Sequence, residues 1–251
     1  MEDSTDQTLR GRSALVTGAS RRIGAAIVRD LHAAGARVGI HYHQSADAAA
    51  DLCQSLNDIR PQSAATFKAD LIDVAQCSAL TAAFTAWAGS LSILVNNAST
   101  FYPTPLGSIT EDQWNDLLGS NLKGPLFLTQ SAAALLAKER GAVINIVDIH
   151  ARRPLKDHPV YGAAKAGLEM LTRALAKDMA PDVRVNGVAP GAILWPQDGM
   201  SDKNKMAILQ QIPLQCPGEP QDIAECVLYL ATAKYVTGQI IAVDGGRSTG
   251  W

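Results

Sequence analysis

The chain has 251 residues, of which 47% are hydrophobic, and a formal net charge of −2 at pH 7. This length and apolar content suit one large α/β domain, and the near-neutral charge argues against a basic face for nucleic acid. The first twelve residues lack the apolar core of a signal peptide, and no run is long enough to span a membrane. We therefore expect a cytoplasmic protein with no nucleic-acid or membrane partner, with residues 1–10 flexible. The four cysteines are scattered, and no metal site is predicted.

Short apolar runs alternate with longer helical patterns along the chain. The predicted strands are Ser13–Thr17, Arg37–Tyr42, Ser63–Lys68, Ile93–Asn96, Ala142–Val147, Val183–Val188 and Gln239–Val243. The predicted helices are Arg22–Ala34, Ala46–Ile59, Val74–Trp87, Glu111–Ala137, Pro159–Met179 and Pro220–Thr232. This alternation predicts a Rossmann-like, doubly wound parallel sheet of seven strands with helices on both faces, in a single domain over 1–251. Residues 191–217, the least regular stretch, are expected to form a lid over the ligand edge.

A glycine-rich turn joins the first predicted strand to the first predicted helix, and it spans Thr17–Gly24. Gly18 permits a tight turn, Gly24 lets the helix pack close to the strand, and free helix N–H groups point at an anion. Arg22 stands where the middle glycine of such a turn is expected, so it would place a cation and a planar fork of donors over the cofactor phosphates. For an isolated motif of this spacing, a solvated arginine on an ordinary turn would be the simpler interpretation.

A tyrosine and a lysine, Tyr161 and Lys165, are spaced four residues apart in a predicted helix and so share one helix face. A lysine ammonium beside a phenol is expected to lower the tyrosine pKa and make the phenol a proton donor near neutral pH. The pair gains weight from its context, because Asn96–Ser99 ends the fourth strand, Asn121 sits in the next long helix, and Pro190-Gly191 follows the sixth strand.

With these motifs the chain resembles the short-chain dehydrogenase/reductase family over essentially its whole length, which implies a nicotinamide cofactor and hydride transfer. The resemblance also rests on Asp70 after the third strand and on the closing Val243–Gly246. It implies catalytic roles for Asp148, Tyr161, Lys165 and Asn121, with Asn121 holding a water that links Lys165 to solvent. It implies cofactor contacts from Gly18, Arg21, Arg22, Ile23, Gly24, His43, Ser45, Asp70, Asn97, Ala98, Ser99, Lys165, Pro190 and Gly191.

At two positions the chain departs from the usual family pattern, and at both it resembles the pteridine reductases within the family. Arg22 replaces a glycine, and Asp148 stands thirteen residues before Tyr161, where the family usually has a serine. The resemblance implies that Phe101 stacks on a pterin ring, and it places substrate contacts at Arg22, Ser99, Phe101, Asp148, Tyr161 and Trp195. A carboxylate repels developing alkoxide charge, but it can accept from a pterin N–H or hold Tyr161 as a proton donor to a ring nitrogen. Asp148 therefore favours reduction of C=N over C=O.

The segment after the second predicted strand indicates which cofactor is used. It reads His41-Tyr42-His43-Gln44-Ser45, without the acidic residue that a cofactor with a free 2′-hydroxyl prefers. Arg21 or Arg22 can approach the same corner, and His43 and Ser45 can donate to a 2′-phosphate, so NADPH is favoured. Gln44 carries no charge where related enzymes often have a second basic residue, and this weakens the expected preference for NADPH over NADH.

Three functions stay open at this point. The leading hypothesis is NADPH-dependent reduction of dihydrobiopterin or dihydrofolate, with oxidised pterins as further substrates. The alternatives are a carbonyl or 3-oxoacyl reductase of the same family, and a non-catalytic dinucleotide sensor. The resemblance implies a homotetramer built on the long helices. Trp251 is expected either to pack across a subunit interface, with Arg247 near a neighbour's pocket, or to cover its own subunit.

Overall fold

Seven parallel strands form one sheet in the order β3-β2-β1-β4-β5-β6-β7. The computed structural model describes residues 7–193 and 201–250. The strands are β1 (Ser13–Val16), β2 (Arg37–Tyr42), β3 (Ala64–Lys68), β4 (Ile93–Asn96), β5 (Ala142–Ile146), β6 (Arg184–Pro190) and β7 (Ile240–Val243). The strand order reverses between β1 and β4, and such a switch point opens a crevice beyond the carboxyl ends of the strands.

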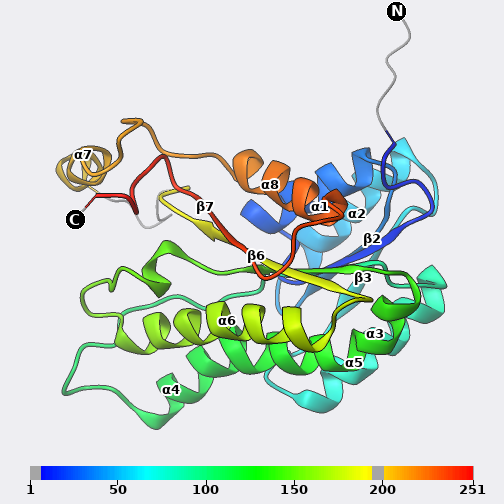
Figure 1. Ribbon diagram of the computed structural model, residues 1–251, viewed down its shortest axis with the longest axis horizontal. Helices are drawn as coiled ribbons and strands as arrows, with labels where there is room; N and C mark the ends of the chain where they lie inside the picture. The colour runs from blue at the N-terminus through cyan, green and yellow to red at the C-terminus, as the bar shows by residue number, and fades with distance from the viewer. Residues whose placement is uncertain (1–6, 194–200, 251) are drawn as a thin grey trace, which may run out of the picture.

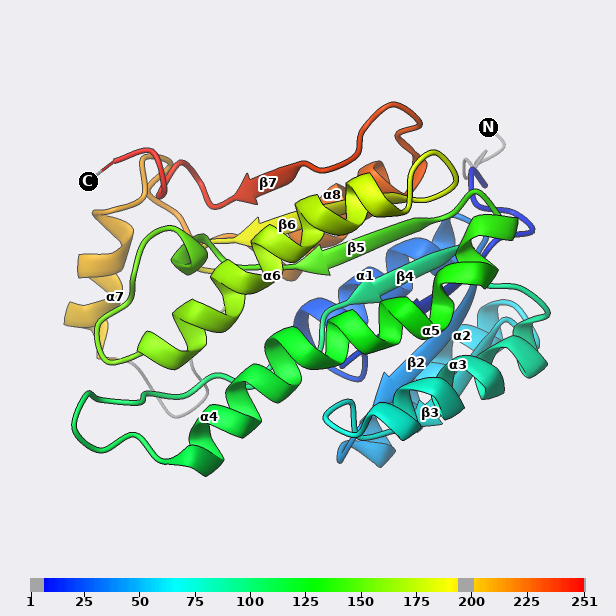
Figure 2. The same cartoon turned by 60° about the horizontal axis from the view of Figure 1, so that its bottom comes forward.

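Helices cover both faces of the sheet (Figure 1). One face carries α1 (Arg22–Ala33), α2 (Ala46–Ile59) and α8 (Pro220–Thr232). The other carries α3 (Val74–Ala88), α4 (Glu111–Leu118), α5 (Gly124–Lys138) and α6 (Pro159–Asp178). A short α7 (Asp202–Leu209) lies beyond the sheet edge near the C-terminal end of the chain (Figure 2). The predicted doubly wound, seven-stranded fold is confirmed.

The central strands are buried on both sides, which explains why they read as continuous apolar runs. In β1, Ala14 and Val16 pack in the cluster that includes residues of α1, α2 and α8. Leu15, between them, packs in the opposite cluster with Leu80 and Leu128 from α3 and α5. Successive strand residues point to opposite faces, so one short strand contributes to both halves of the core.

The predicted helix over Glu111–Ala137 is interrupted in the structure. A π-helical segment, Gly119–Lys123, separates α4 from α5 and carries Asn121. The Asn121 side chain is fully buried there, and its Nδ2 donates to the Leu117 carbonyl at 3.0 Å. Single π turns inside helices occur often at functional sites, and this one turns a predicted site residue toward the loop after β4.

The predicted lid is more regular than its composition suggests. It contains α7, which begins after Ser201, whose hydroxyl accepts from the Asn204 N–H at 3.3 Å. None of the residues of α7 is buried, so the helix has no apolar stripe that a sequence pattern could reveal. Beyond it, Ile212 is buried and the Leu214 N–H donates to the Gly245 carbonyl. Trp195 lies outside the described residues.

The start of the described chain differs from the expected flexible end. Residues 7–10 form a turn in which the Leu9 side chain is buried and its N–H donates to the Ala34 carbonyl at 2.8 Å. Apolar burial and a hydrogen bond to the end of α1 hold this turn, whereas residues 1–6 lie outside the described part. Within residues 7–193 and 201–250, no helix is long and apolar enough to cross a membrane.

Candidate active site

The predicted site residues gather at one edge of the sheet because all the strands run the same way. Figure 2 shows the arrowheads of β5, β6 and β7 pointing to the side on which α7 lies. The glycine turn follows β1, the segment from Asn97 follows β4, Asp148 follows β5 and Gly191 follows β6. Ligands of open α/β sheets bind at this edge.

The glycine turn has no room for side chains at its two glycines. Gly18 has φ +57°, and a Cβ there would lie 2.8 Å from the Ala98 Cα. A Cβ on Gly24 would lie 2.6 Å from Asn97 Nδ2. The chain therefore packs tightly where α1 begins, and the first N–H groups of a helix have no intrahelical partner. This arrangement fits a pyrophosphate at the start of α1.

Arg22 adopts a backbone conformation that favours glycine. Its φ is +53°, in the left-handed region, and its side chain is exposed at the start of α1. This conformation costs a non-glycine residue about 1–2 kcal/mol. Strain of this kind often marks a functional position, because only a compensating interaction favours retaining it. Arg21, its neighbour, is also exposed.

The Asn-Asn-Ala motif after β4 holds the glycine turn in place. Thr17 Oγ1 accepts from the N–H groups of Asn97 and Ala98, each at 2.9 Å. Asn97 Nδ2 donates to the carbonyls of Thr17, at 2.8 Å, and Gly18, at 2.9 Å. The Asn97 carboxamide thus serves as part of the scaffold of the cofactor turn. Its predicted direct contact with the cofactor stays a prediction.

The residues predicted to choose the cofactor lie at the ends of β2 and β3, which are neighbours in the sheet. His43 is exposed, and Ser45 immediately precedes α2 without using its side chain to cap that helix. Asp70 follows β3, and its Oδ1 accepts from the Ile72 N–H at 3.0 Å. His43 and Ser45 therefore stand just before the N-terminus of α2, a position that favours a phosphate group.

Asp148 and Tyr161 are joined directly. The Tyr161 hydroxyl donates to Asp148 Oδ2 at 2.7 Å, and the His150 N–H donates to Asp148 Oδ1 at 2.8 Å. Asp148 caps a short 3₁₀ turn, Ile149–Ala151, directly after β5. Tyr161 is buried in the first turn of α6, which begins at Pro159. The carboxylate is therefore held on both oxygens, and the phenol is oriented by it.

The predicted effect of Lys165 on Tyr161 is wrong for this structure. Burial raises the pKa of Tyr161, and the nearby Asp148 carboxylate raises it further. Lys165 Nζ donates to the Ile146 carbonyl at 2.9 Å and lies 5.8 Å from the Tyr161 ring centroid. Burial lowers the pKa of Lys165 to about 8, with the Asp148 charge opposing the change. The phenol is thus kept protonated, as a donor to the carboxylate.

Asn121 organises the segment after β4. Its Oδ1 accepts from the Ser99 hydroxyl at 2.6 Å, and its Nδ2 donates to the Thr100 carbonyl at 2.9 Å. The Ser99 hydroxyl also faces Tyr161, where it acts to lower the pKa of the phenol against the larger effects of burial and Asp148. Asn121 therefore positions Ser99 beside the phenol. The predicted water between Asn121 and Lys165 stays a prediction.

Phe101 forms an aromatic group with two residues of the segment around α6. Its ring stacks on the His158 ring, with centroids 4.7 Å apart and an interplanar angle of 15°. It meets Tyr161 edge to face, with centroids 4.8 Å apart and an angle of 79°. Phe101 is 54% exposed, and His158 stacks on one face of its ring. Sequence reasoning missed His158, although its spacing of three residues from Tyr161 is the available signal.

The end of β6 meets the chain's C-terminal segment. A Cβ on Gly191 would lie 2.6 Å from the Asp244 Cα, so the two segments pack without room for a side chain. Arg247 Nη2 donates to Gln211 Oε1 at 3.3 Å, and burial lowers the pKa of Arg247 while the Asp148 charge raises it. Arg247 thus lies within electrostatic reach of Asp148 in its own subunit. Trp251 lies outside the described residues.

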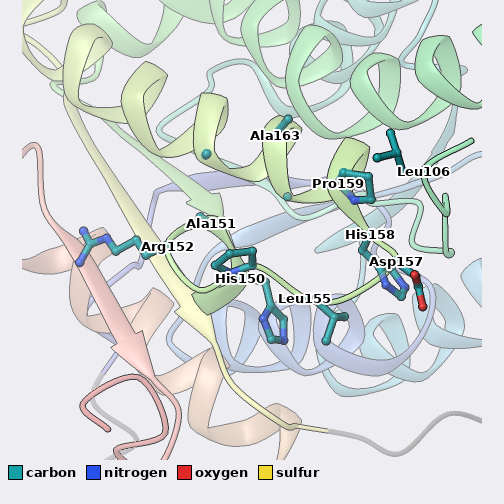
Figure 3. Close-up of a pocket in the computed structure, with 12 residues that line it drawn as sticks. Leu106, His150, Ala151, Arg152, Leu155, Asp157, His158, Pro159 and Ala163 are labelled. Carbon is teal, nitrogen blue, oxygen red and sulfur yellow. The ribbon is translucent and has the colours of Figure 1, made fainter. Parts of the chain in front are cut away.

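A hollow of about 530 Å³ adjoins α6 but does not hold the catalytic group (Figure 3). Its lining comes from Leu106, the segment after β5 and the first turns of α6, where Gly162, Ala163 and Ala166 contribute. Tyr161 and Lys165 are not among the lining residues, because they point from another face of the helix. His158 borders both the hollow and Phe101.

Comparison with known proteins places the chain in a family. A family model described as Enoyl-(Acyl carrier protein) reductase matches residues 18–248. Pteridine reductase 1 of Leishmania tarentolae is 39% identical, with 94% of this chain and 96% of the relative covered. The 3-oxoacyl-[acyl-carrier-protein] reductase of Staphylococcus aureus strain Mu50 is 37% identical, with 94% and 97% covered. The chain therefore belongs to the short-chain dehydrogenase/reductase family, whose members are oxidoreductases that use NAD(P).

Proposed function

We propose that this protein reduces pteridines with NADPH, with dihydrobiopterin or dihydrofolate as substrate. The observation that supports this most is the hydrogen bond from the Tyr161 hydroxyl to the Asp148 carboxylate, at 2.7 Å. A fixed negative charge at this position opposes the alkoxide that develops when a carbonyl is reduced. It favours a substrate that brings N–H donors to the carboxylate and a ring nitrogen to the phenol.

The residues around the glycine turn fit the cofactor. The close packing at Gly18 and Gly24 leaves the start of α1 open to a pyrophosphate, and Arg22 adds a cation there. His43 and Ser45 would donate to the 2′-phosphate that distinguishes NADPH from NADH. When bound, the cofactor supplies the hydride.

The substrate side fits a flat, polar-rimmed ring. Phe101 offers a half-exposed aromatic ring next to Tyr161, and Ser99 presents a hydroxyl held by Asn121. Asp148 would accept from a pterin N–H or amino group. Tyr161, with Asp148 and Lys165, would supply the proton to the adjacent ring nitrogen.

A second candidate function is reduction of 3-oxoacyl groups. It is favoured by the 37% identity to the Staphylococcus aureus enzyme, which nearly equals the identity to the Leishmania tarentolae pteridine reductase. The two proposals differ at Asp148, since a carboxylate is a poor partner for a carbonyl oxygen that gains negative charge.

A substrate panel tests the proposal. NADPH oxidation would be followed with dihydrobiopterin, dihydrofolate, biopterin, a 3-oxoacyl thioester and simple ketones, and NADH would be compared in parallel. We expect turnover with a dihydropteridine and little with the thioester or ketones. Turnover of the thioester alone would replace the proposal with the second candidate. Cofactor binding with no turnover of any substrate would point to a dinucleotide sensor.

A further inference from the structure

One buried histidine, His41, connects three segments that border the cofactor edge. It sits near the end of β2 with 2% of its surface exposed. Its Nδ1 lies 3.1 Å from the Gly18 backbone nitrogen, and its Nε2 lies 3.1 Å from the Ala69 carbonyl oxygen. Its own carbonyl accepts from the Ala19 N–H at 2.9 Å. The imidazole thus bridges the glycine turn after β1 to the end of β3.

The partners determine which ring nitrogen carries the proton. The Gly18 N–H can only donate, so Nδ1 must be the acceptor, and the Ala69 carbonyl can only accept, so Nε2 must carry hydrogen. His41 is therefore a neutral imidazole with one defined tautomer. A protonated ring would place two N–H groups against each other at Gly18. Burial lowers the pKa of His41 to about 4, which agrees with this geometry.

The same contacts determine what the turn offers to a ligand. The N–H groups of Gly18 and Ala19 are both occupied by His41, from inside the protein. The first N–H groups of α1, from Arg22 onward, have no intrahelical partner and point toward an anion at the helix start. His41 also holds the glycine turn at a constant position relative to Ala69, which directly precedes Asp70.

We propose that His41 is a positioning residue for the cofactor, because it fixes the glycine turn, the end of β2 and the end of β3 in one arrangement. It touches neither the reacting groups nor, by its burial, the bound nucleotide. Its loss should therefore weaken cofactor binding and leave the chemical step intact. The inference rests on the NAD(P) site of the family, and only its NADPH readout rests on the proposed function.

Variants can separate its two hydrogen bonds. His41→Phe keeps the ring volume and removes both bonds. His41→Asn keeps an acceptor near the position of Nδ1 for the Gly18 N–H and removes the donor to Ala69. Dissociation constants for NADPH and NADH would be measured by titration of protein fluorescence, alongside kcat at saturating cofactor and the thermal midpoint. We expect His41→Phe to raise the dissociation constant about tenfold, with kcat within about twofold of the wild type. His41→Asn should recover part of the lost cofactor affinity.

His32 provides a matched control. It is another buried histidine with 2% exposure, and its Nε2 bonds the Ser63 hydroxyl at 2.6 Å, away from the glycine turn. We expect His32→Phe to lower the thermal midpoint comparably while leaving cofactor affinity unchanged. Equal losses of affinity in the His32 and His41 variants would overturn the inference, because they would show a general effect of destabilisation.

The tautomer offers a test that needs no variant activity. Long-range ¹H–¹⁵N correlation spectra of the wild-type imidazoles should show His41 protonated at Nε2 only, both with and without cofactor. A proton on Nδ1 would refute the bond to Gly18 and with it the proposed role. If the wild type bound neither nicotinamide cofactor, the proposed function would fail, whereas normal cofactor binding by His41→Phe would remove this inference alone.

Discussion

The two halves of the candidate site are built in different ways. On the side of β1, β2 and β3, the glycine turn is held by backbone groups and buried side chains, with Thr17 and His41 bonding to main-chain atoms. On the side of β4, β5 and β6, the groups assigned to the proposed substrate are side chains bonded to one another, and Phe101 is half exposed. The half proposed to hold the dinucleotide is therefore built on backbone geometry, whereas the half proposed to select the substrate is built on a few side chains.

The largest effect is expected from Tyr161→Phe, which tests the substrate side alone. The phenylalanine keeps the packing against Phe101 but cannot give a proton, so turnover should fall about 10²–10⁴-fold with cofactor affinity unchanged. Tyr102→Phe is a matched control, because the Tyr102 hydroxyl also donates to a carboxylate, Asp116 Oδ2 at 2.9 Å. Near-normal turnover in Tyr161→Phe would place the proton donor elsewhere.

A change of Asp148 to serine should alter substrate choice. We expect at least a ~100-fold loss of dihydropteridine turnover, together with a relative gain for carbonyl substrates, since the serine hydroxyl can polarise a carbonyl oxygen. Cofactor affinity should stay within about twofold, because the carboxylate lies on the substrate side. Undiminished dihydropteridine reduction by Asp148→Ser would contradict the role assigned to the carboxylate.

Acidification should destabilise the fold through two buried histidines. Burial lowers the pKa of both His32 and His41 from 6.5 to about 4, so the unfolded chain binds their protons at a higher pH than the folded chain. The contribution of the two neutral histidines to the free energy of unfolding is therefore fully present above about pH 6.5. It falls by about 2–3 kcal/mol for each histidine as the pH drops toward 4. Urea unfolding of the wild type between pH 7 and pH 4.5 measures this slope, which should be shallower in His32→Phe and His41→Phe. Equal slopes in all three proteins would argue against buried neutral histidines.

A smaller effect is expected from Arg22→Gly, which should weaken cofactor binding but increase stability. Loss of a charge-assisted contact should weaken NADPH binding about tenfold, and NADH binding less. Relief of the left-handed conformation should raise the free energy of unfolding by up to about 1 kcal/mol. Arg140→Gly is the matched control, because Arg140 also has a positive φ, +47°, outside the site. Equal weakening for both cofactors would exclude a contact with the 2′-phosphate.

The fold and the position of the site could be predicted because both depend on local patterns. Buried parallel strands are apolar throughout, and the site motifs stand at strand ends, so their convergence follows from the topology. The predicted strands agree with the observed strands to within two residues at each end. The π-helical segment and α7 could not be predicted, since the first depends on tertiary bonds of Asn121 and the second lacks an apolar face.

The electrostatics of the site were the least predictable part. Spacing of four residues placed Tyr161 and Lys165 on one helix face, but the pKa of the phenol depends on distances and burial that spacing does not encode. The lysine bonds the Ile146 carbonyl, and the carboxylate of Asp148 is the nearer charge. Likewise His41 resembles any strand residue in the sequence, and only its bond to Gly18 connects it with the cofactor edge.

The π-helical segment between α4 and α5 changes the direction in which the residues after it face around the helix axis. Bonds from each residue to the fifth one along act like the insertion of one residue, which turns the later helix by about 100° relative to an unbroken one. Leu117 before the segment and Leu128 after it are both fully buried, and Asn121 between them still faces the loop after β4. Deleting one residue from Gly119–Lys123 should therefore restore a continuous helix with α5 in its present phase, and Asn121 should lose the turn that directs it to the loop after β4.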